Sequence, residues 1–261
     1  MSAPFLHVEN LTKQFGGVLA VNNTSFKVEQ GEIFAVIGPN GAGKTTLLNM
    51  ISGVLPSTSG SIRFQGKNIT GQPPYRIARA GITRTFQNLE IFKNMSVIEN
   101  VMTGAHIRLK TGLLGAGFRL PGVFREERKT AELALKCLEQ VGIAHLAYEK
   151  AETLPYGNQR LLEIARASAS DPAMILLDEP MAGLNAQETE RLVDVILLMK
   201  QKGMTFMFVE HDIETVMAIS DRILVLDNGI QIGSGTPEEI YQNAAVIKAY
   251  LGDEREEIVH A

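Results

Sequence analysis

The sequence lacks tryptophan and has only one cysteine, Cys137, among its 261 residues. A single thiol cannot form an internal disulfide, which excludes a disulfide-stabilised secreted domain and favours a reducing cytoplasm. Any run of about 18 uninterrupted apolar residues, the length that a membrane-spanning helix requires, is also lacking. Residues 1–15 have no basic region followed by an apolar run, so we expect no secretory signal. If this protein works at a membrane, another protein must anchor it there.

An excess of positive charge is absent as well. Lys and Arg number 25 against 29 Asp and Glu, which gives a formal net charge of −4. Proteins that hold nucleic acid over a large surface neutralise its phosphates with an excess of Lys and Arg. We therefore expect no nucleic acid among the partners of this chain.

Apolar residues, in contrast, are plentiful. They make up 45% of the chain, enough to bury an ordinary globular core. The length is at the upper end for one domain. We expect a single domain over residues 1–253, followed by a polar tail over residues 254–261.

Two apolar patterns occur along the chain. Alternating apolar and polar residues predict antiparallel strands with one exposed face at 5–10, 24–29 and 61–65. Continuous apolar runs predict buried parallel strands at 33–38, 173–178, 205–210 and 222–227. Helical patterns lie at 44–52, 126–141, 159–169 and 187–202, and the turn Asp227-Asn228-Gly229 predicts a hairpin into a strand at about 230–233. Strands that alternate with helices in this way indicate an α/β fold.

A glycine-rich loop follows the first continuous apolar run and opens a helix, which is the context that a phosphate-binding loop requires. Its residues are Gly38, Pro39, Asn40, Gly41, Ala42, Gly43, Lys44 and Thr45. The glycines let successive backbone N–H groups converge on phosphates, and the helix N-terminus adds partial positive charge. We expect Lys44 to bridge the β- and γ-phosphates of ATP and the Thr45 hydroxyl to ligate Mg²⁺.

Two carboxylates and a histidine follow later apolar runs. Asp178 and Glu179 stand at the end of one predicted strand and His211 at the end of another, so all three should reach the same edge of the sheet. Taken singly, such an acidic pair reads as a cap of a turn, and such a histidine as a surface or core residue. Beside the phosphate-binding loop they favour catalysis. Asp178 would serve the Mg²⁺ site, Glu179 would polarise the attacking water, and His211 would hydrogen-bond that water and the γ-phosphate.

The segment LPYGNQRLLEIARA at 154–167 resembles the signature segment of the ABC ATPases and the helix that follows it. The resemblance covers nearly the whole chain, because the other motifs stand in the family's order. It implies a P-loop NTPase fold, with a mainly parallel sheet, an N-terminal antiparallel β subdomain and an α-helical subdomain inserted at about 88–168. An extra segment at about 105–128 is either a surface excursion or a contact with transmembrane subunits or the membrane.

The resemblance also implies roles for further residues. Phe15 stands at the position of the aromatic that stacks on adenine, although alone it reads as a core residue. Gln87 stands at the position of the glutamine that joins the Mg²⁺ and γ-phosphate site to the membrane partner, although alone it reads as a surface loop residue. Thr46 of the first loop and Tyr156 and Gly157 of the signature are expected to contact nucleotide.

Two signature positions depart from the family's common pattern. Pro155 stands where a serine usually helps to hold the γ-phosphate across a dimer, so backbone amides at the helix start would have to bind it. Asn158 replaces the usual glutamine and has a shorter reach. The segment AGLN at 182–185 matches the family's loop between paired ATPases.

Within the family, the chain is most similar to the ATPases of branched-chain amino acid importers, through LPYGNQR, LLDEPMAGLN, VEHDIETVMAISDRILVLDNG and AAVIKAYLG. This resemblance implies a peripheral protein on the cytoplasmic face of the inner (plasma) membrane. Its partners would be a second ABC ATPase subunit, identical or different, two transmembrane permease subunits and, through these, an external substrate-binding protein. Urea, amides, other amino acids and lipopolysaccharide stay open as substrates, because the other subunits select the substrate.

Two other classes of function compete with transport. Soluble ABC ATPases that act on ribosomes or DNA usually carry two cassettes, a long coiled coil or a basic extension, and the sequence shows none of these. A nucleotide-binding regulator that does not hydrolyse ATP would not need Glu179, which is present.

Overall fold

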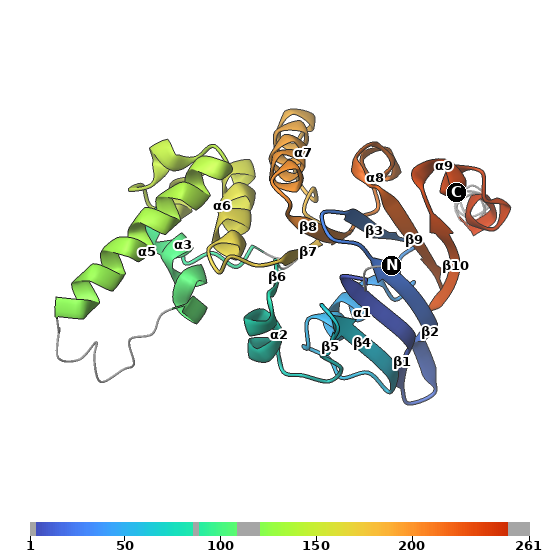
Figure 1. The fold of residues 1–261 in the computed structure, drawn as a ribbon. Coiled ribbons are helices and arrows are strands. Elements are labelled where there is room, and N and C mark those ends of the chain that lie inside the picture. Colours follow the sequence, from blue (N-terminus) through green and yellow to red (C-terminus); the bar gives the residue numbers. More distant parts are fainter. Residues whose placement is uncertain (1–3, 86–88, 109–120, 250–261) are drawn as a thin grey trace.

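The computed structural model describes residues 4–85, 89–108 and 121–249. Strands from these residues form one ten-stranded sheet in the order β5-β4-β1-β2-β10-β9-β3-β8-β7-β6 (Figure 1). The strands are β1 (Leu6–Phe15), β2 (Val18–Val28), β3 (Ile33–Ile37), β4 (Ser59–Phe64), β5 (Lys67–Asn68), β6 (Ile82–Arg84), β7 (Met174–Asp178), β8 (Thr205–Val209), β9 (Arg222–Asp227) and β10 (Ile230–Gly235). Gln87, residues 109–120 of the extra segment and the predicted tail lie outside the described residues.

One half of the sheet is parallel and buried. β3 lies between β8 and β9, β7 pairs with β8, and β6 pairs with β7, all in parallel. Every residue of β3, β7 and β8 is buried, which is why these strands read as continuous apolar runs. The predicted α/β fold with a mainly parallel sheet is confirmed.

The other half is antiparallel and continues the same sheet. β1 pairs with both β2 and β4, and one parallel pair, Ile230 with Asn22, joins β10 to β2. β10 also forms the predicted hairpin with β9. Its turn holds Asn228 at φ 46° and Gly229 at φ 78°, the positive values that a tight hairpin turn needs.

Helices cover both faces of the sheet. They are α1 (Lys44–Ile51), α2 (Pro74–Ala80), α3 (Val97–Gly104), α5 (Pro121–Gln140), α6 (Tyr156–Ser168), α7 (Ala186–Gln201), α8 (Ile213–Ile219) and α9 (Pro237–Tyr241). Ile33 and Ile37 belong to the core under α7 and α8, and Phe34 belongs to the core that contains residues of α1. The sheet therefore separates two apolar cores.

α3, α5 and α6 pack on one another beside the β6 edge of the sheet (Figure 1). The subdomain limits of about 88–168 stay a prediction. Among the described helices, none combines the length and apolar character that crossing a membrane demands.

The structure shifts two helix starts and adds short elements. α5 begins at Pro121 rather than 126, and α6 begins at Tyr156 rather than 159, because the signature turn itself is helical. The sequence did not predict α2, β6, α3, α8 or α9, each of eight residues or fewer. Elements that short show too little periodicity to be recognised.

Candidate nucleotide-binding and hydrolysis site

The glycine-rich loop joins β3 to α1 and is held tightly between other strands. Gly38 has φ 151°, and a Cβ there would lie 2.0 Å from the Leu226 carbonyl oxygen of β9. Gly43 has φ 99°, and a Cβ there would lie 2.2 Å from the Ala20 carbonyl oxygen of β2. The path of the loop therefore requires glycine at both positions.

Gly38→Ala should lower the melting temperature by roughly 5–10 °C, because overpacking typically costs about 1–3 kcal/mol and a backbone oxygen cannot move aside easily. The control is Gly66→Ala. Gly66 also has a positive φ, 75°, but a Cβ there would meet no atom within 4 Å. Thermal unfolding of both variants checks this; equal melting temperatures would show that the contact with Leu226 is not restrictive.

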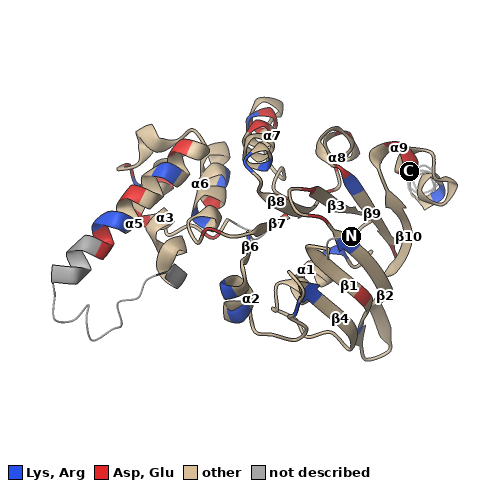
Figure 2. Cartoon of the chain, viewed as in Figure 1, with Lys and Arg blue, Asp and Glu red and all other residues tan. Residues whose placement is uncertain are grey.

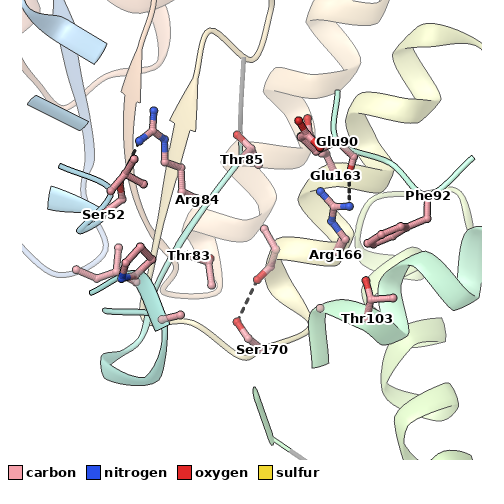
Figure 3. A pocket seen from close by; sticks show the side chains of 16 residues that line it. Ser52, Thr83, Arg84, Thr85, Glu90, Phe92, Thr103, Glu163, Arg166 and Ser170 are labelled. Carbon is pink, nitrogen blue, oxygen red and sulfur yellow. Dashed lines mark hydrogen bonds between the residues drawn. The ribbon is translucent and has the colours of Figure 1, made fainter. Parts of the chain in front are cut away.

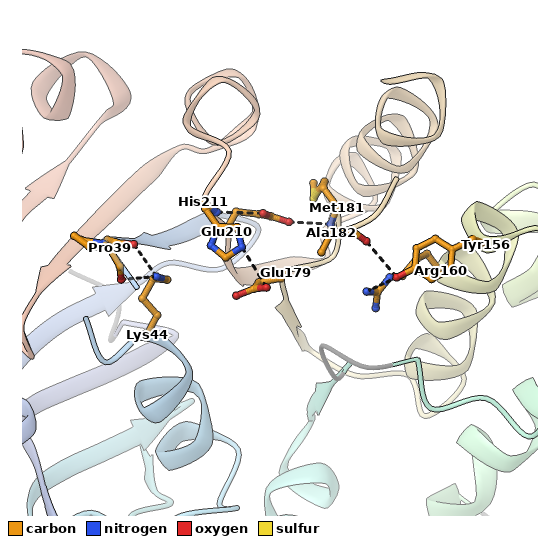
Figure 4. A network of polar contacts seen from close by, with 10 residues as sticks. Pro39, Lys44, Tyr156, Arg160, Glu179, Met181, Ala182, Glu210 and His211 are labelled. Atoms are coloured by element: carbon orange, nitrogen blue, oxygen red, sulfur yellow. Dashed lines mark hydrogen bonds and ion pairs between the residues drawn. The ribbon is translucent and has the colours of Figure 1, made fainter. Parts of the chain in front are cut away.

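Lys44 is buried at the first position of α1 and its ammonium group points back into the loop (Figure 4). Nζ donates to the carbonyl oxygens of Gly38 at 2.6 Å and Pro39 at 2.9 Å. Burial lowers the pKa of Lys44, and the carboxylates of Glu179 and Asp178 oppose that shift. A cation thus lies where β3 ends, within the field of the two predicted acidic residues.

Asp178 ends β7 and is paired in a way that the sequence did not reveal. Its Oδ2 accepts a hydrogen bond from Nη2 of Arg84 at 2.7 Å, and both side chains are buried. Arg84 also donates to Asn49 at 2.6 Å and to Ser52 at 2.9 Å, so it ties β6 to α1. The second oxygen, Oδ1, is buried and has no hydrogen-bond partner among the residues that the structure describes. An unsatisfied carboxylate oxygen of this kind suits a cation or its water ligand.

Glu179 and His211 meet at the carboxyl ends of β7 and β8. His211 Nε2 lies 3.2 Å from Glu179 Oε2, and the imidazole is about half exposed while the carboxylate is mostly buried. Glu179 has φ 49°, an uncommon value for a residue other than glycine, and its N–H donates to Val209 at 2.9 Å. The prediction that these residues reach one sheet edge is confirmed in its geometry.

The signature turn is fastened to the segment that follows Glu179. The Tyr156 hydroxyl donates to the carbonyl of Ala182 at 3.2 Å, and the Gly157 N–H donates to Oε1 of Glu188 at 3.2 Å. A Cβ on Gly157 would lie 2.7 Å from the same carboxylate oxygen. The helix-start amide expected to bind phosphate therefore already has a carboxylate partner within the chain.

Asn158, one of the two departures from the common signature, also has a partner within the chain. Its Oδ1 accepts a hydrogen bond from Nη1 of Arg191 at 3.0 Å, and Nη2 of Arg191 donates to Gly142 at 3.1 Å. Glu188 and Arg191 lie one turn apart on α7. Together they hold the start of α6 against the start of α7.

Phe15, at the end of β1, is 49% exposed, so its reading as a core residue is wrong. Lys13 Nζ lies 5.0 Å from the centre of its ring. The ring is thus partly accessible to a flat ligand. Gln87 lies outside the described residues.

Comparisons with known proteins give one consistent result. The ABC transporter family matches residues 21–182, and the family of branched-chain amino acid ATP-binding cassette transporters matches residues 231–256. The high-affinity branched-chain amino acid transport ATP-binding protein BraF of Pseudomonas aeruginosa is 46% identical over 254 residues, with 97% of this chain and 100% of BraF covered. Its counterpart LivG of Escherichia coli is 43% identical, with the same coverage. The ADP conformation of an ATP-binding cassette of an ABC transporter is 35% identical and superposes with a TM-score of 0.84, with 96% of this chain and 100% of that chain covered.

Proposed function

We propose that this chain, which belongs to the ABC transporter family, energises a membrane importer for branched-chain or other hydrophobic amino acids. It is the ATP-hydrolysing subunit of such a transporter. The observation that carries the proposal is the similarity over nearly the full length to two proteins named for branched-chain amino acid transport. The match of residues 231–256 to a family of the same description supports it.

In this function, the loop from Gly38 to Thr46 binds the phosphates of ATP. The close approach of the loop to neighbouring strands and the buried ammonium group of Lys44 support the assignment. Thr45, Asp178 and Gln87 would hold Mg²⁺, which would supply positive charge to neutralise the phosphates. The unsatisfied Oδ1 of Asp178 supports that choice of ligand set.

Glu179 acts as the general base. Its carboxylate accepts a proton from the attacking water, and His211 orients that water and the γ-phosphate by hydrogen bonds. The 3.2 Å separation of the two side chains supports a shared task. Phe15 stacks on the adenine through its exposed ring.

A second ATPase subunit completes each site. Tyr156 and Gly157 contact the nucleotide held by that partner, with the Gly157 amide exchanging its Glu188 contact for phosphate. Closing the pair on ATP and reopening it after hydrolysis shifts the population between two arrangements, which the permease uses for alternating access.

The permease docks in a cavity of about 590 Å³ between α2 and the helices α3 and α6 (Figure 3). Val54 and Phe92, both about half exposed, give it apolar walls, and Thr85, two positions before Gln87 in the sequence, also lines it. Only basic charge lies on α2, whereas both signs alternate along α5 (Figure 2). The charged residues that line the cavity, Arg84, Arg166, Glu90 and Glu163, also carry both signs. A short permease helix with apolar residues toward Val54 and Phe92 matches this surface.

Purification of the tagged chain from detergent-solubilised native membranes tests the proposal. We expect two polytopic membrane proteins and a second ATPase to co-purify, and the complex in proteoliposomes, with its binding protein, to import radiolabelled leucine. Uptake of urea or an amide but not leucine would reassign the substrate. Recovery of soluble partners alone would contradict the importer and favour an ATPase acting on a cytoplasmic machine.

A further inference from the structure

Glu210 is a buried carboxylate to which no role has been given above. It lies between the end of β8 and His211, and only 2% of its surface is exposed. Its Oε1 accepts a hydrogen bond from the N–H of Met181 at 2.8 Å, and its Oε2 accepts one from the N–H of His211 at 3.2 Å (Figure 4). Both oxygens therefore bind backbone.

The two backbone groups belong to the two segments that carry the proposed hydrolytic residues. Met181 follows Glu179 by two positions, and His211 supplies the imidazole that faces Glu179 at 3.2 Å. Strands β7 and β8, from which these segments leave, are paired up to Asp178 and Val209. Beyond that last pair, two hydrogen bonds still join the segment after β7 to the segment after β8. The Glu179 N–H donates to the Val209 carbonyl oxygen, and the Met181 N–H donates to the Glu210 carboxylate.

Burying the ionised carboxylate of Glu210 costs free energy, which a residue without a role would not require. Burial raises the pKa of Glu210, and the charge of Glu179 adds to that rise. The two N–H donors and His211 act in the opposite direction. An ionised group accepts from both donors, whereas protonation turns one of its oxygens into a donor and weakens one of the two bonds.

We propose that Glu210 is a positioning residue for ATP hydrolysis, which fixes Glu179 and His211 relative to each other by accepting one backbone N–H from each of their segments. The inference rests on the catalytic roles proposed for these two residues. Glu210 itself touches neither nucleotide nor the attacking water.

The arrangement gives hydrolysis an acid-sensitive component. As the pH falls, Glu210 becomes protonated, one segment loses its acceptor and turnover declines. The titratable groups that face Glu210 are Glu179, at the end of β7, and His211, before α8. Lys44, on α1, acts on Glu179 from the side of the phosphates.

The test is Glu210→Gln, which keeps the shape but replaces one accepting oxygen with an NH₂ group. We expect kcat to fall about tenfold with the Kd for ATP within about twofold of the wild type, because only the geometry of the transition state is disturbed. The acid limb of the pH–rate profile should move to lower pH, since the group that titrates has been removed. In the His211→Ala background, Glu210→Gln should reduce kcat by less than it does alone.

Glu32→Gln is the matched control. Glu32 is also a buried carboxylate, and burial raises its pKa. It also accepts a backbone N–H, from Glu29 at 2.6 Å. It lies, however, just before β3, at the amino ends of the parallel strands and so at the end of the sheet opposite to the site. We expect Glu32→Gln to lower the melting temperature and to leave kcat and the pH profile unchanged.

A Glu210→Gln enzyme with the kcat and pH profile of the wild type, whatever its melting temperature, would overturn the inference. If Glu210→Gln does not fold, Glu210→Asp decides, because its shorter side chain cannot reach both donors; wild-type kcat in that variant would also overturn it. The proposed site fails separately if Glu179→Gln still hydrolyses ATP.

Discussion

Glu179→Gln should bind ATP with nearly wild-type affinity and lose at least about 99% of its turnover, since general base catalysis contributes about 10²–10⁴-fold. A glutamine side chain cannot accept the proton of the attacking water. It does retain an oxygen that can face His211, 3.2 Å away in the wild type. The backbone bond from position 179 to Val209 does not depend on the side chain. The change thus removes the base and leaves the local structure in place.

Release of phosphate and binding of a fluorescent ATP analogue measure the two properties separately. Glu190→Gln, on the exposed surface of α7, removes the same charge near the same segment and should hydrolyse ATP like the wild type. Undiminished hydrolysis by Glu179→Gln would show that another group activates the water.

Lys44→Ala should weaken ATP binding by roughly 10–100-fold. A charge-assisted hydrogen bond contributes about 1.5–3 kcal/mol, and this ammonium group is already desolvated, so binding of phosphate does not have to strip it of water. The variant also loses the two bonds by which Nζ holds the carbonyls of Gly38 and Pro39. Both effects act in the same direction, because a less ordered loop binds phosphate less well.

Titration calorimetry with ATP measures this change. Lys67→Ala, on the exposed strand β5, removes an equal charge far from the loop and should bind ATP like the wild type. Equal affinity of Lys44→Ala and Lys67→Ala would contradict the assignment of the glycine-rich loop to phosphate.

The place where the polar residues gather, at the carboxyl ends of the parallel strands, is predictable from the sequence because it follows from simple rules. Continuous apolar runs marked the central strands, and residues directly after parallel strands must gather at one edge. This reasoning predicts Asp178, Glu179 and His211, whereas Lys44 is predicted from the glycine-rich loop. Phe15 was found only by its place in the resemblance, because a phenylalanine in an alternating strand otherwise reads as core.

The contacts that hold the edge together were not predictable, because they join residues far apart in the sequence. Arg84 belongs to a three-residue strand, and its bond to Asp178 spans 94 positions. Glu210 sits beside a recognised histidine, but nothing in the sequence shows which backbone groups its oxygens accept. Glu188 had a local signal, since Asn185 and Glu188 form a capping box at the start of α7. Its second bond, to Gly157, depends on how α6 and α7 pack.

Because of its bond to Glu188, the Gly157 amide can report on the contact between α6 and α7 through its hydrogen-exchange rate. The Gly157 N–H stands in the first turn of α6, where no earlier helical carbonyl can accept it, so its acceptor is the Glu188 carboxylate. Its deuterium exchange rate therefore reports how often the signature turn comes away from α7. Because the first turn of a helix exchanges rapidly when it has no such acceptor, Glu188→Ala should bring Gly157 to the rate of a frayed end. The exchange rate of this one amide can then show how often α6 separates from α7, both while ATP is bound and while it is hydrolysed.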